Sequence, residues 1–290
     1  MKISKAFLRI GILCSKIRLE EKLLFQEFAK QNIELVQLNP NSLSIKNGKA
    51  DFGQIDLLLN REIAQTRAEL ILELVDKAGI KTVNSAQATK LCNNKALTTT
   101  FLKEAGIPVP KTMVAFSSDE AMKAAEEIGY PLVIKPLWGS WGRLLSKVDT
   151  PEALEAILEH KQALNSPYHS IFYLQEYIEK PDRDIRVFVV GGKPIAAMYR
   201  VSKHWLTNTA KGAVPKSMEL NKELHDLVIK TVEVLGVEIA GVDVVESKNG
   251  YLVLEANATP EFHGLKEVTN VNIAKLIVEY VTGGKNNGKN

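Results

Sequence analysis

The stretch Val242–Asn257, VDVVESKNGYLVLEAN, decides the fold of this chain. Two apolar runs flank the turn signal KNG, a pattern that is typical of a β-hairpin. Three oxygen-bearing side chains lie within those runs: Asp243, Glu255 and Asn257. Because a carboxylate is costly to bury among valines and leucines without a partner, the pattern predicts a cation or another charged partner beside this hairpin.

The loop length of this hairpin decides which side chains meet, because successive side chains of a strand point to opposite faces. A two-residue turn would place Asp243 opposite Ala256 and the two carboxylates on opposite faces. A three-residue KNG loop would instead set Asp243 directly across from Glu255. We expect the three-residue loop, with Gly250 in the left-handed conformation and Asn257 two residues along on the same face.

Facing carboxylates repel each other and raise each other's pKa unless a cation lies between them. Mg²⁺ suits this set, because it prefers hard oxygen ligands and fills its remaining positions with water and phosphate oxygens. The residues alone also allow an acidic hairpin whose charges face solvent. The metal hypothesis assigns the ligands Asp243, Glu255 and Asn257.

Four cationic residues accompany the hairpin. Lys95 lies in a predicted helix, and Lys135 ends the apolar run of PLVIKP. Arg186 alternates with apolar residues in DIRVFVV, and Arg200 follows AAMY. Any one of them alone is typical of a solvated surface residue. Together, beside a magnesium site, they match the charge of a triphosphate and of a transferring phosphoryl group.

A loop rich in glycine follows Lys135 and fits the same interpretation. Glycines let backbone amides approach phosphate oxygens, and a mobile loop can close over a reaction and exclude water. On its own such a glycine pair more often marks only a turn. The loop residues are Gly139, Ser140, Trp141, Gly142 and Arg143.

The bulk composition is that of an ordinary globular protein with two or three domains: 290 residues, 45% hydrophobic and 24% charged. A formal charge of +3 falls far short of a nucleic-acid-binding signature. Cys14 and Cys92 form neither a disulfide framework nor a metal knuckle, which favours the reducing cytoplasm. No apolar run reaches the length of a membrane span, and the N-terminal MKISKAFLRIGILC predicts a first strand rather than a signal peptide.

Residues 1–86 alternate strand and helix patterns, which predicts a small parallel sheet covered by helices. No GxGxxG follows the first strand, so a dinucleotide site is not expected there. One helix is predicted over about 86–105 and another from Ser117, the N-cap, to Gly129, with Glu120 at the capping-box position. A further helix starts at Thr150-Pro151. Strands dominate from Phe172, interrupted by helices at about 222–235 and 270–281.

In this order the motifs resemble those of the ATP-grasp carboxylate–amine ligases, over essentially the whole chain. The segments that carry the resemblance are Lys95, VIKP with Lys135, the glycine-rich loop, LQEYIE at 174–179, DIRVFV at 184–189 and the Asp243/Glu255/Asn257 set. Within that superfamily the chain is similar to the RimK-like group. The stretches WLTNTAKG at 205–212 and ANATPEFHG at 256–264 resemble its LysX/ArgX type, which attaches an amino acid to the carrier protein LysW.

The resemblance implies a mixed α/β and α+β architecture: an ATP-grasp fold behind an N-terminal Rossmann-like, or pre-ATP-grasp, domain with a parallel sheet. The implied units are the N-terminal domain at 1–86, a central subdomain with the glycine-rich loop at 87–175, and a C-terminal subdomain with an antiparallel sheet and the magnesium site at 176–284. A flexible tail, 285–290, follows.

The resemblance also implies roles for residues. Lys95 and Lys135 would contact ATP phosphates, residues 176–178 would line the adenine pocket, and Asp184 would hold the ribose. The catalytic residues would be Arg186 and Arg200, which steady the transferring phosphoryl group and the acyl phosphate. The full nucleotide-binding set would be Lys95, Lys135, Gly139, Ser140, Trp141, Gly142, Arg143, Gln175, Glu176, Tyr177, Ile178, Asp184, Arg200, Asn208, Thr209 and Ala210.

The implied reaction uses ATP and Mg²⁺ to phosphorylate the side-chain carboxylate of the carrier's C-terminal glutamate. The α-amine of a free amino acid then attacks the acyl phosphate and releases phosphate. The implied pathway is arginine biosynthesis, and a role in lysine biosynthesis is left open. Such chemistry needs positioning and charge neutralisation more than a strong nucleophile. We assign no general base, and expect His204 and His263 to be hydrogen-bonded structural histidines.

The donor amino acid is expected to depend on the residues after EFH, Gly264 and Leu265. The glycine matches the glutamate type, whereas the leucine departs from it. Glutamate is therefore the expected donor, with 2-aminoadipate, or both, left open, because one methylene is worth only about 1–3 kcal/mol of discrimination. A RimK-like glutamate ligase with another acceptor and a non-catalytic ATP-binding module are the alternatives.

The expected partner is a small acidic carrier protein of the LysW kind, drawn in by Lys203, Lys211 and Lys216. A solvated lysine cluster explains the same three residues almost as well. Neither nucleic acid nor a membrane is expected as a partner. The resemblance also implies a homo-oligomer, a dimer or a tetramer.

Overall fold

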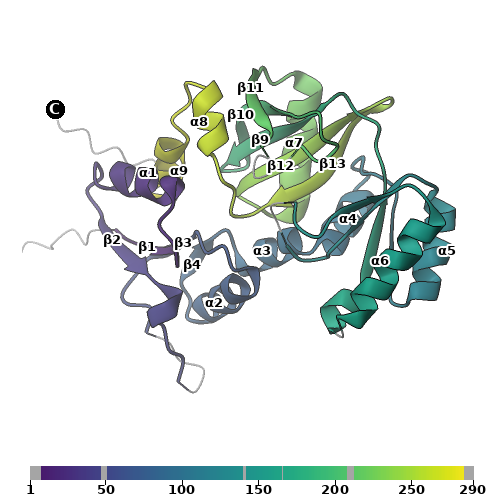
Figure 1. The fold of residues 1–290 in the computed structure, drawn as a ribbon. Helices are drawn as coiled ribbons and strands as arrows, with labels where there is room; N and C mark the ends of the chain where they lie inside the picture. The colour runs from purple at the N-terminus through teal and green to yellow at the C-terminus, as the bar shows by residue number, and fades with distance from the viewer. Residues whose placement is uncertain (1–7, 47–50, 140–141, 165, 208–211, 284–290) are drawn as a thin grey trace, which may run out of the picture.

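Three β-sheets divide the chain, and helices lie between and around them (Figure 1). The structure is a computed structural model, and it describes residues 8–46, 51–139, 142–164, 166–207 and 212–283. Within those ranges, none of the helices combines the length and the apolar character that crossing a membrane requires.

The N-terminal sheet has the strand order β2-β1-β3-β4, and all of its pairs are parallel, as expected. Its strands are β1 (Arg9–Leu13), β2 (Glu34–Leu38), β3 (Leu57–Asn60) and β4 (Lys81–Val83). The helices of this unit are α1 (Leu19–Phe28), α2 (Gln65–Lys77) and the 3-10 turn η1 (Pro40–Ser42). The carboxyl ends of the strands, where ligands commonly bind in parallel sheets, face the rest of the molecule (Figure 1).

The second sheet is antiparallel, in the order β5-β8-β6-β7, with its own core beneath two helices. Its elements are β5 (Thr112–Ala115), α5 (Ser118–Ile128), β6 (Leu132–Lys135), β7 (Ser146–Val148), α6 (Pro151–Ala163), η2 (Pro167–Ser170) and β8 (Phe172–Glu176). The predicted cap of α5 is confirmed, since the Ser117 hydroxyl accepts from the backbone N–H of Glu120 at 3.2 Å. The Glu120 side chain does not close a capping box but pairs with Lys123 at 2.7 Å.

The third sheet is antiparallel, in the order β11-β10-β9-β12-β13. Its strands are β9 (Arg183–Val190), β10 (Lys193–Val201), β11 (Val214–Met218), β12 (Ile239–Ser247) and β13 (Gly250–Asn257). One face shares a core with α3 (Ala86–Asn93), α4 (Lys95–Glu104) and α7 (Lys222–Leu235). The other face packs against the closing helices α8 (His263–Val268) and α9 (Ile273–Val281), whose core continues into β1 and β3.

The single helix predicted over 86–105 is wrong, because the chain breaks at Asn94 into α3 and α4. Asn94 has an extended backbone, and its side-chain oxygen accepts from the N–H groups of Ala96 and Leu97. Asparagine favours this capping role over an interior helical position. The break places Lys95 at the first turn of α4, where its N–H donates to the carbonyl of Leu137 at 3.2 Å.

The hairpin of β12 and β13 pairs Asp243 with Glu255, as expected, but reaches this register by another route. The loop has two residues (KN) rather than three, and Ser247 pairs with Gly250. Continued without interruption, that register would set Asp243 opposite Leu254. A β-bulge makes Leu254 an extra residue and shifts the remaining pairs by one. The predicted loop is therefore wrong, while the predicted carboxylate pairing is confirmed.

Candidate active site

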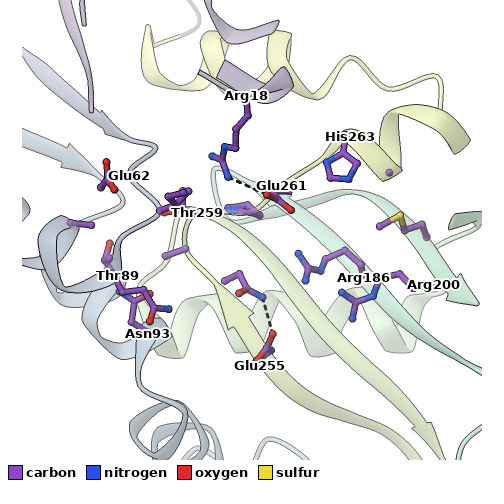
Figure 2. Close-up of a pocket in the computed structure, with 18 residues that line it drawn as sticks. Arg18, Glu62, Thr89, Asn93, Arg186, Arg200, Glu255, Thr259, Glu261 and His263 are labelled. Atoms are coloured by element: carbon purple, nitrogen blue, oxygen red, sulfur yellow. Dashed lines mark hydrogen bonds and ion pairs between the residues drawn. The ribbon is translucent and has the colours of Figure 1, made fainter. Parts of the chain in front are cut away.

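Two clefts meet at the third sheet, and the predicted site residues are divided between them. The first cleft encloses about 900 Å³, counted with the solvent at its mouth, and lies between the N-terminal unit and the third sheet (Figure 2). The second encloses about 490 Å³ and lies between the second and third sheets. The bulge connects them, since Leu254 lines the second cleft while its neighbour Glu255 lines the first.

Strand register brings the two predicted arginines together. Arg186 lies beside Asp243 across β9 and β12, and Arg200 lies beside Asp184 across β10 and β9. Arg186 donates from Nε to Asp243, and from Nη2 to Asp243 Oδ2 at 2.8 Å. Arg200 donates to both oxygens of Asp184, at 2.6 and 2.9 Å, and its Nη2 lies 3.1 Å from Asp243 Oδ2.

This network of two arginines and two aspartates is strongly charged but balanced. Burial alone would raise the pKa of Asp243, but the guanidiniums of Arg186 and Arg200 outweigh burial and lower it. Burial alone would lower the pKa of Arg200, but the carboxylates of Asp243 and Asp184 outweigh it and raise it. Arg200 therefore stays charged. The hydrogen bonds of the described residues leave Nη1 of each arginine free to reach a ligand in the first cleft.

Glu255 lies beside the two predicted lysines. The Nζ of Lys95 is 3.9 Å from Glu255 Oε2 and donates to the carbonyl of Gly139 at 2.7 Å. The Nζ of Lys135 donates to Gln175 Oε1 at 2.6 Å. Withdrawal from water, with a smaller contribution from Lys95, lowers the pKa of Lys135 to about 8 against the opposite effect of Glu255. A negatively charged phosphate beside Lys135 would stabilise the protonated form of this lysine.

The predicted magnesium ligands are only partly arranged for a metal. Asn257 Nδ2 donates to Glu255 Oε1 at 3.3 Å, so these two side chains adjoin on one face of β13. Both oxygens of Asp243 accept hydrogen bonds from arginines, and its assignment as a magnesium ligand stays a prediction. In the part of the chain that the structure describes, no three His, Cys, Asp or Glu side chains are grouped to hold a metal. One carboxylate and one amide oxygen nevertheless fit Mg²⁺ whose other ligands are phosphates and water.

The second cleft has apolar and aromatic residues among its lining residues. Its walls include the segment 175–178 that was predicted to contact adenine. Tyr177 meets Trp205 edge-to-face, with ring centroids 6.5 Å apart. The Gln175 side chain is buried and binds Lys135, so it positions that lysine. A flat aromatic ligand would find apolar surface here from both sheets.

Asp184 has several protein partners, and its predicted contact with the ribose stays a prediction. It is buried, both of its oxygens bind Arg200, and it also accepts from the hydroxyl of Thr207. Lys180 Nζ lies 3.8 Å from the same carboxylate. With these partners, Asp184 orients Arg200.

Some of the other predicted site residues lie outside the part of the chain that the structure describes, and the rest are described. Ser140 and Trp141 of the glycine-rich loop, and Asn208, Thr209, Ala210 and Lys211, lie outside the described residues. Gly139 and Gly142 both have positive φ angles, and the N–H of Gly139 donates to Gln65 Oε1 at 3.0 Å. Gly264 lines the first cleft, and its role in donor specificity stays a prediction. Leu265 does not, because its side chain is fully buried in the core.

The two histidines have structural partners. His263 Nδ1 lies 2.8 Å from Glu20 Oε1, and His204 Nδ1 accepts from the N–H of Leu206 at 3.1 Å. The hydrogen bond to Glu20 raises the pKa of His263 against the effect of burial. Both histidines are hydrogen-bonded, as expected, and we assign neither as a general base.

Sequence reasoning assigned no role to several residues that line the clefts, among them Arg18 and Glu261 in the first and Trp205 and Lys180 in the second. Trp205 begins the stretch WLTNTAKG, and Lys180 directly follows LQEYIE, so proximity to these motifs could have found both. Arg18 had no such signal. It precedes its partner Glu261 by 243 residues, and only the tertiary fold brings the two together.

Comparisons with known proteins give matches over nearly the whole chain. Residues 92–281 match the RimK-like ATP-grasp domain, and residues 10–91 match the LysX preATP-grasp domain. The alpha-aminoadipate–LysW ligase LysX of Saccharolobus solfataricus is 36% identical, over 90% of this chain and 96% of its own. The glutamate–LysW ligase ArgX of Sulfolobus acidocaldarius is 35% identical, over 97% and 99%. A RimK domain ATP-grasp protein of Sphaerobacter thermophilus superposes with a TM-score of 0.81 at 27% identity, covering 94% of this chain and 98% of its own.

Proposed function

The chain belongs to the RimK-like ATP-grasp ligase family, with a LysX-type preATP-grasp domain before it, and we propose that it joins glutamate to a LysW-like carrier protein. ATP-grasp ligases bind ATP and form C–N bonds. In this proposal the bond joins the α-amino group of glutamate to the side-chain carboxylate of the carrier's C-terminal glutamate, through an acyl phosphate. The carrier is small and acidic, and the pathway is arginine biosynthesis.

The junction of the two clefts carries this proposal. Asp184 lines the second cleft while the arginine it binds, Arg200, lines the first. A nucleotide whose base lies in the second cleft would therefore present its terminal phosphate to Nη1 of Arg186 and Arg200. The carboxylate that receives the phosphoryl group would enter from the first cleft.

The arginines and lysines supply charge and position. Lys95 and Lys135 would neutralise the phosphates, and Arg186 and Arg200 would hold the transferring group in line with the attacking carboxylate. The paired aspartates keep both guanidiniums fixed, so no reorganisation is needed at the moment of transfer. The amine then attacks the acyl carbon, the C–O bond to phosphate breaks, and the proton of the amine leaves to solvent or phosphate.

Glu255 and Asn257 would hold Mg²⁺, with Asp243 able to join them only if an arginine releases it. When bound, the ion would offset charge on the phosphate oxygens. Because both cysteines are buried and unpaired, a reducing compartment, the cytoplasm, suits the chain.

The donor and the acceptor are tested in one experiment. Purified protein, ATP, Mg²⁺ and a LysW-type carrier are incubated with glutamate and 2-aminoadipate in competition, and the product is identified by its intact mass. The expected product is carrier plus one glutamyl residue. Equal addition of 2-aminoadipate would make the chain bifunctional, an outcome favoured by the 36% identity to a LysX enzyme.

Other results would refute the proposal. Product on a short peptide that lacks the carrier's acidic tail would indicate a RimK-like ligase with another acceptor. ATP binding without any ADP release, whatever acceptor is supplied, would indicate a non-catalytic module.

A further inference from the structure

The far wall of the first cleft carries an arginine that the reaction chemistry does not use. Arg18 immediately precedes α1, and its side chain is 19% exposed. Its Nη1 donates to Glu261 Oε1 at 3.2 Å, across the cleft (Figure 2). Glu261 is 30% exposed at its side chain, and the described residues give its carboxylate no other hydrogen bond.

Arg18 is held rigidly on its other side. Glu21 accepts from Nε at 2.9 Å and from Nη2 at 2.7 Å. The Glu21 side chain is fully buried and also accepts from Nε of Arg61 at 2.9 Å. Because this buried clamp fixes two of the three guanidinium nitrogens, the third is aimed into the cleft, where a partly exposed glutamate is its partner.

The charges around Arg18 call for one carboxylate at this position. Arg18, Arg61 and His263 contact two buried carboxylates, those of Glu20 and Glu21. A further acidic group of this wall, Glu62, is tied to Arg67 at 2.8 Å. A substrate carboxylate that took the place of Glu261 would keep a negative charge beside Nη1 of Arg18, so the exchange would cost little electrostatically.

The cleft thus has cationic groups at two places: Nη1 of Arg186 and Arg200 on the sheet, and Nη1 of Arg18 on the N-terminal wall (Figure 2). The lining of the cleft also includes Thr259 and Gly264. We infer that Arg18 binds the side-chain carboxylate of a dicarboxylic donor amino acid, and that Glu261 occupies its place until the substrate displaces it. This rests on the proposed function, because the amine of the donor must lie at the arginines of the sheet.

Arg18 would thereby select the donor amino acid by the charge of its side chain. The amine of the donor, which reacts, would lie at the arginines of the sheet. The variant Arg18→Met should raise KM for glutamate about tenfold to a hundredfold, the usual loss for a hydrogen bond to a charged group. KM for ATP should stay unchanged. The preference for glutamate over glutamine, as a ratio of kcat/KM, should fall by at least about tenfold. The matched control is Arg9→Met, which breaks an Arg–Glu pair of the same unit away from the cleft.

A second variant keeps the inference testable if Arg18→Met fails to fold. Glu261→Gln removes the competing charge, so KM for glutamate should fall about threefold to tenfold, with KM for ATP unchanged. A KM for glutamate that stays within twofold of wild type in Arg18→Met, or rises in Glu261→Gln, overturns the inference while leaving the proposed function standing. If the wild type ligates no amino acid to the carrier, the proposed function falls, and this inference falls with it.

Discussion

Lys135 is the residue whose chemistry depends most directly on pH. Because withdrawal from water lowers its pKa to about 8, the lysine loses its charge just above neutrality when no phosphate is bound. Its folded pKa lies below the unfolded value, so the charged form costs stability below about pH 8, and that cost disappears as the pH rises. ATP binding should change in the opposite sense, since the phosphates need the protonated amine.

We therefore expect the Kd for ATP to rise as the pH increases through about 8, measured by calorimetry on the full chain. The control is Lys135→Met, which should bind ATP more weakly at every pH and lack this step. A wild-type Kd that is constant over the same range, while the nucleotide itself does not titrate, would contradict the assignment of Lys135 to the phosphates.

Gly241 is a second single residue with a testable role, because its lack of a side chain leaves room for the guanidinium of Arg186. A Cβ there would lie 2.6 Å from Nη1 of Arg186 and 3.0 Å from Cβ of Pro260. Because the guanidinium is the flexible end of a side chain, it would move first and leave its ligand position. Gly241→Ala should lower kcat/KM by about a hundredfold, the order expected for a displacement near 1 Å. A kcat/KM within twofold of wild type would show that Nη1 of Arg186 does not touch the reacting group.

At the scale of elements, Asn84 joins the N-terminal sheet to the third sheet. It follows β4, and its Nδ2 donates to the carbonyls of Ile239 and Ala258, at 2.7 and 2.8 Å. Its Oδ1 accepts from the N–H groups of Glu238 and Ile239, both at 2.8 Å. The side chain is buried, so these four bonds have no water to replace them.

Asn84→Ala should therefore lower the free energy of unfolding by about 2–4 kcal/mol, since several buried backbone groups lose their partner. Denaturant unfolding of the two proteins measures this. The matched variant Thr269→Ala, which removes one hydrogen bond from a side chain in a surface turn, should cost much less. A loss below about 0.5 kcal/mol for Asn84→Ala would mean that the two units do not depend on this link.

The helices with clear periodicity and capping residues were predictable from sequence. Ser117 and Thr150 cap α5 and α6 as expected, and α7 spans the expected residues 222–235. The short elements β7, β11 and α8 were not predicted, because three to six residues carry too little periodicity. The Asn94 break was also missed, since a polar residue inside a helical pattern does not reveal whether its side chain turns back to cap.

At the scale of the whole molecule, the mild positive charge bears on the proposed acidic carrier. Lys203 and Lys216 are exposed, after β10 and on β11 respectively. Replacing both by glutamine should slow association with the carrier and flatten its dependence on ionic strength, because steering acts through long-range charge. The control replaces two exposed lysines on other elements, Lys77 and Lys230. Association rates by stopped flow that are the same for all three proteins across ionic strengths would contradict this surface.

The sequence by itself determined the family, the parallel N-terminal sheet, the final hairpin and the charged residues from which the site is built. These features depend on the spacing of residues that are near each other in the sequence, and this spacing can be seen without the tertiary structure. Only the tertiary structure decided that a bulge rather than a longer loop sets Asp243 against Glu255, that Asp184 and Asp243 hold arginines, and that Arg18 meets Glu261. The physical reason is that the partner of a buried charge is chosen by the strands and helices packed beside it, and packing brings together residues that no sequence interval relates.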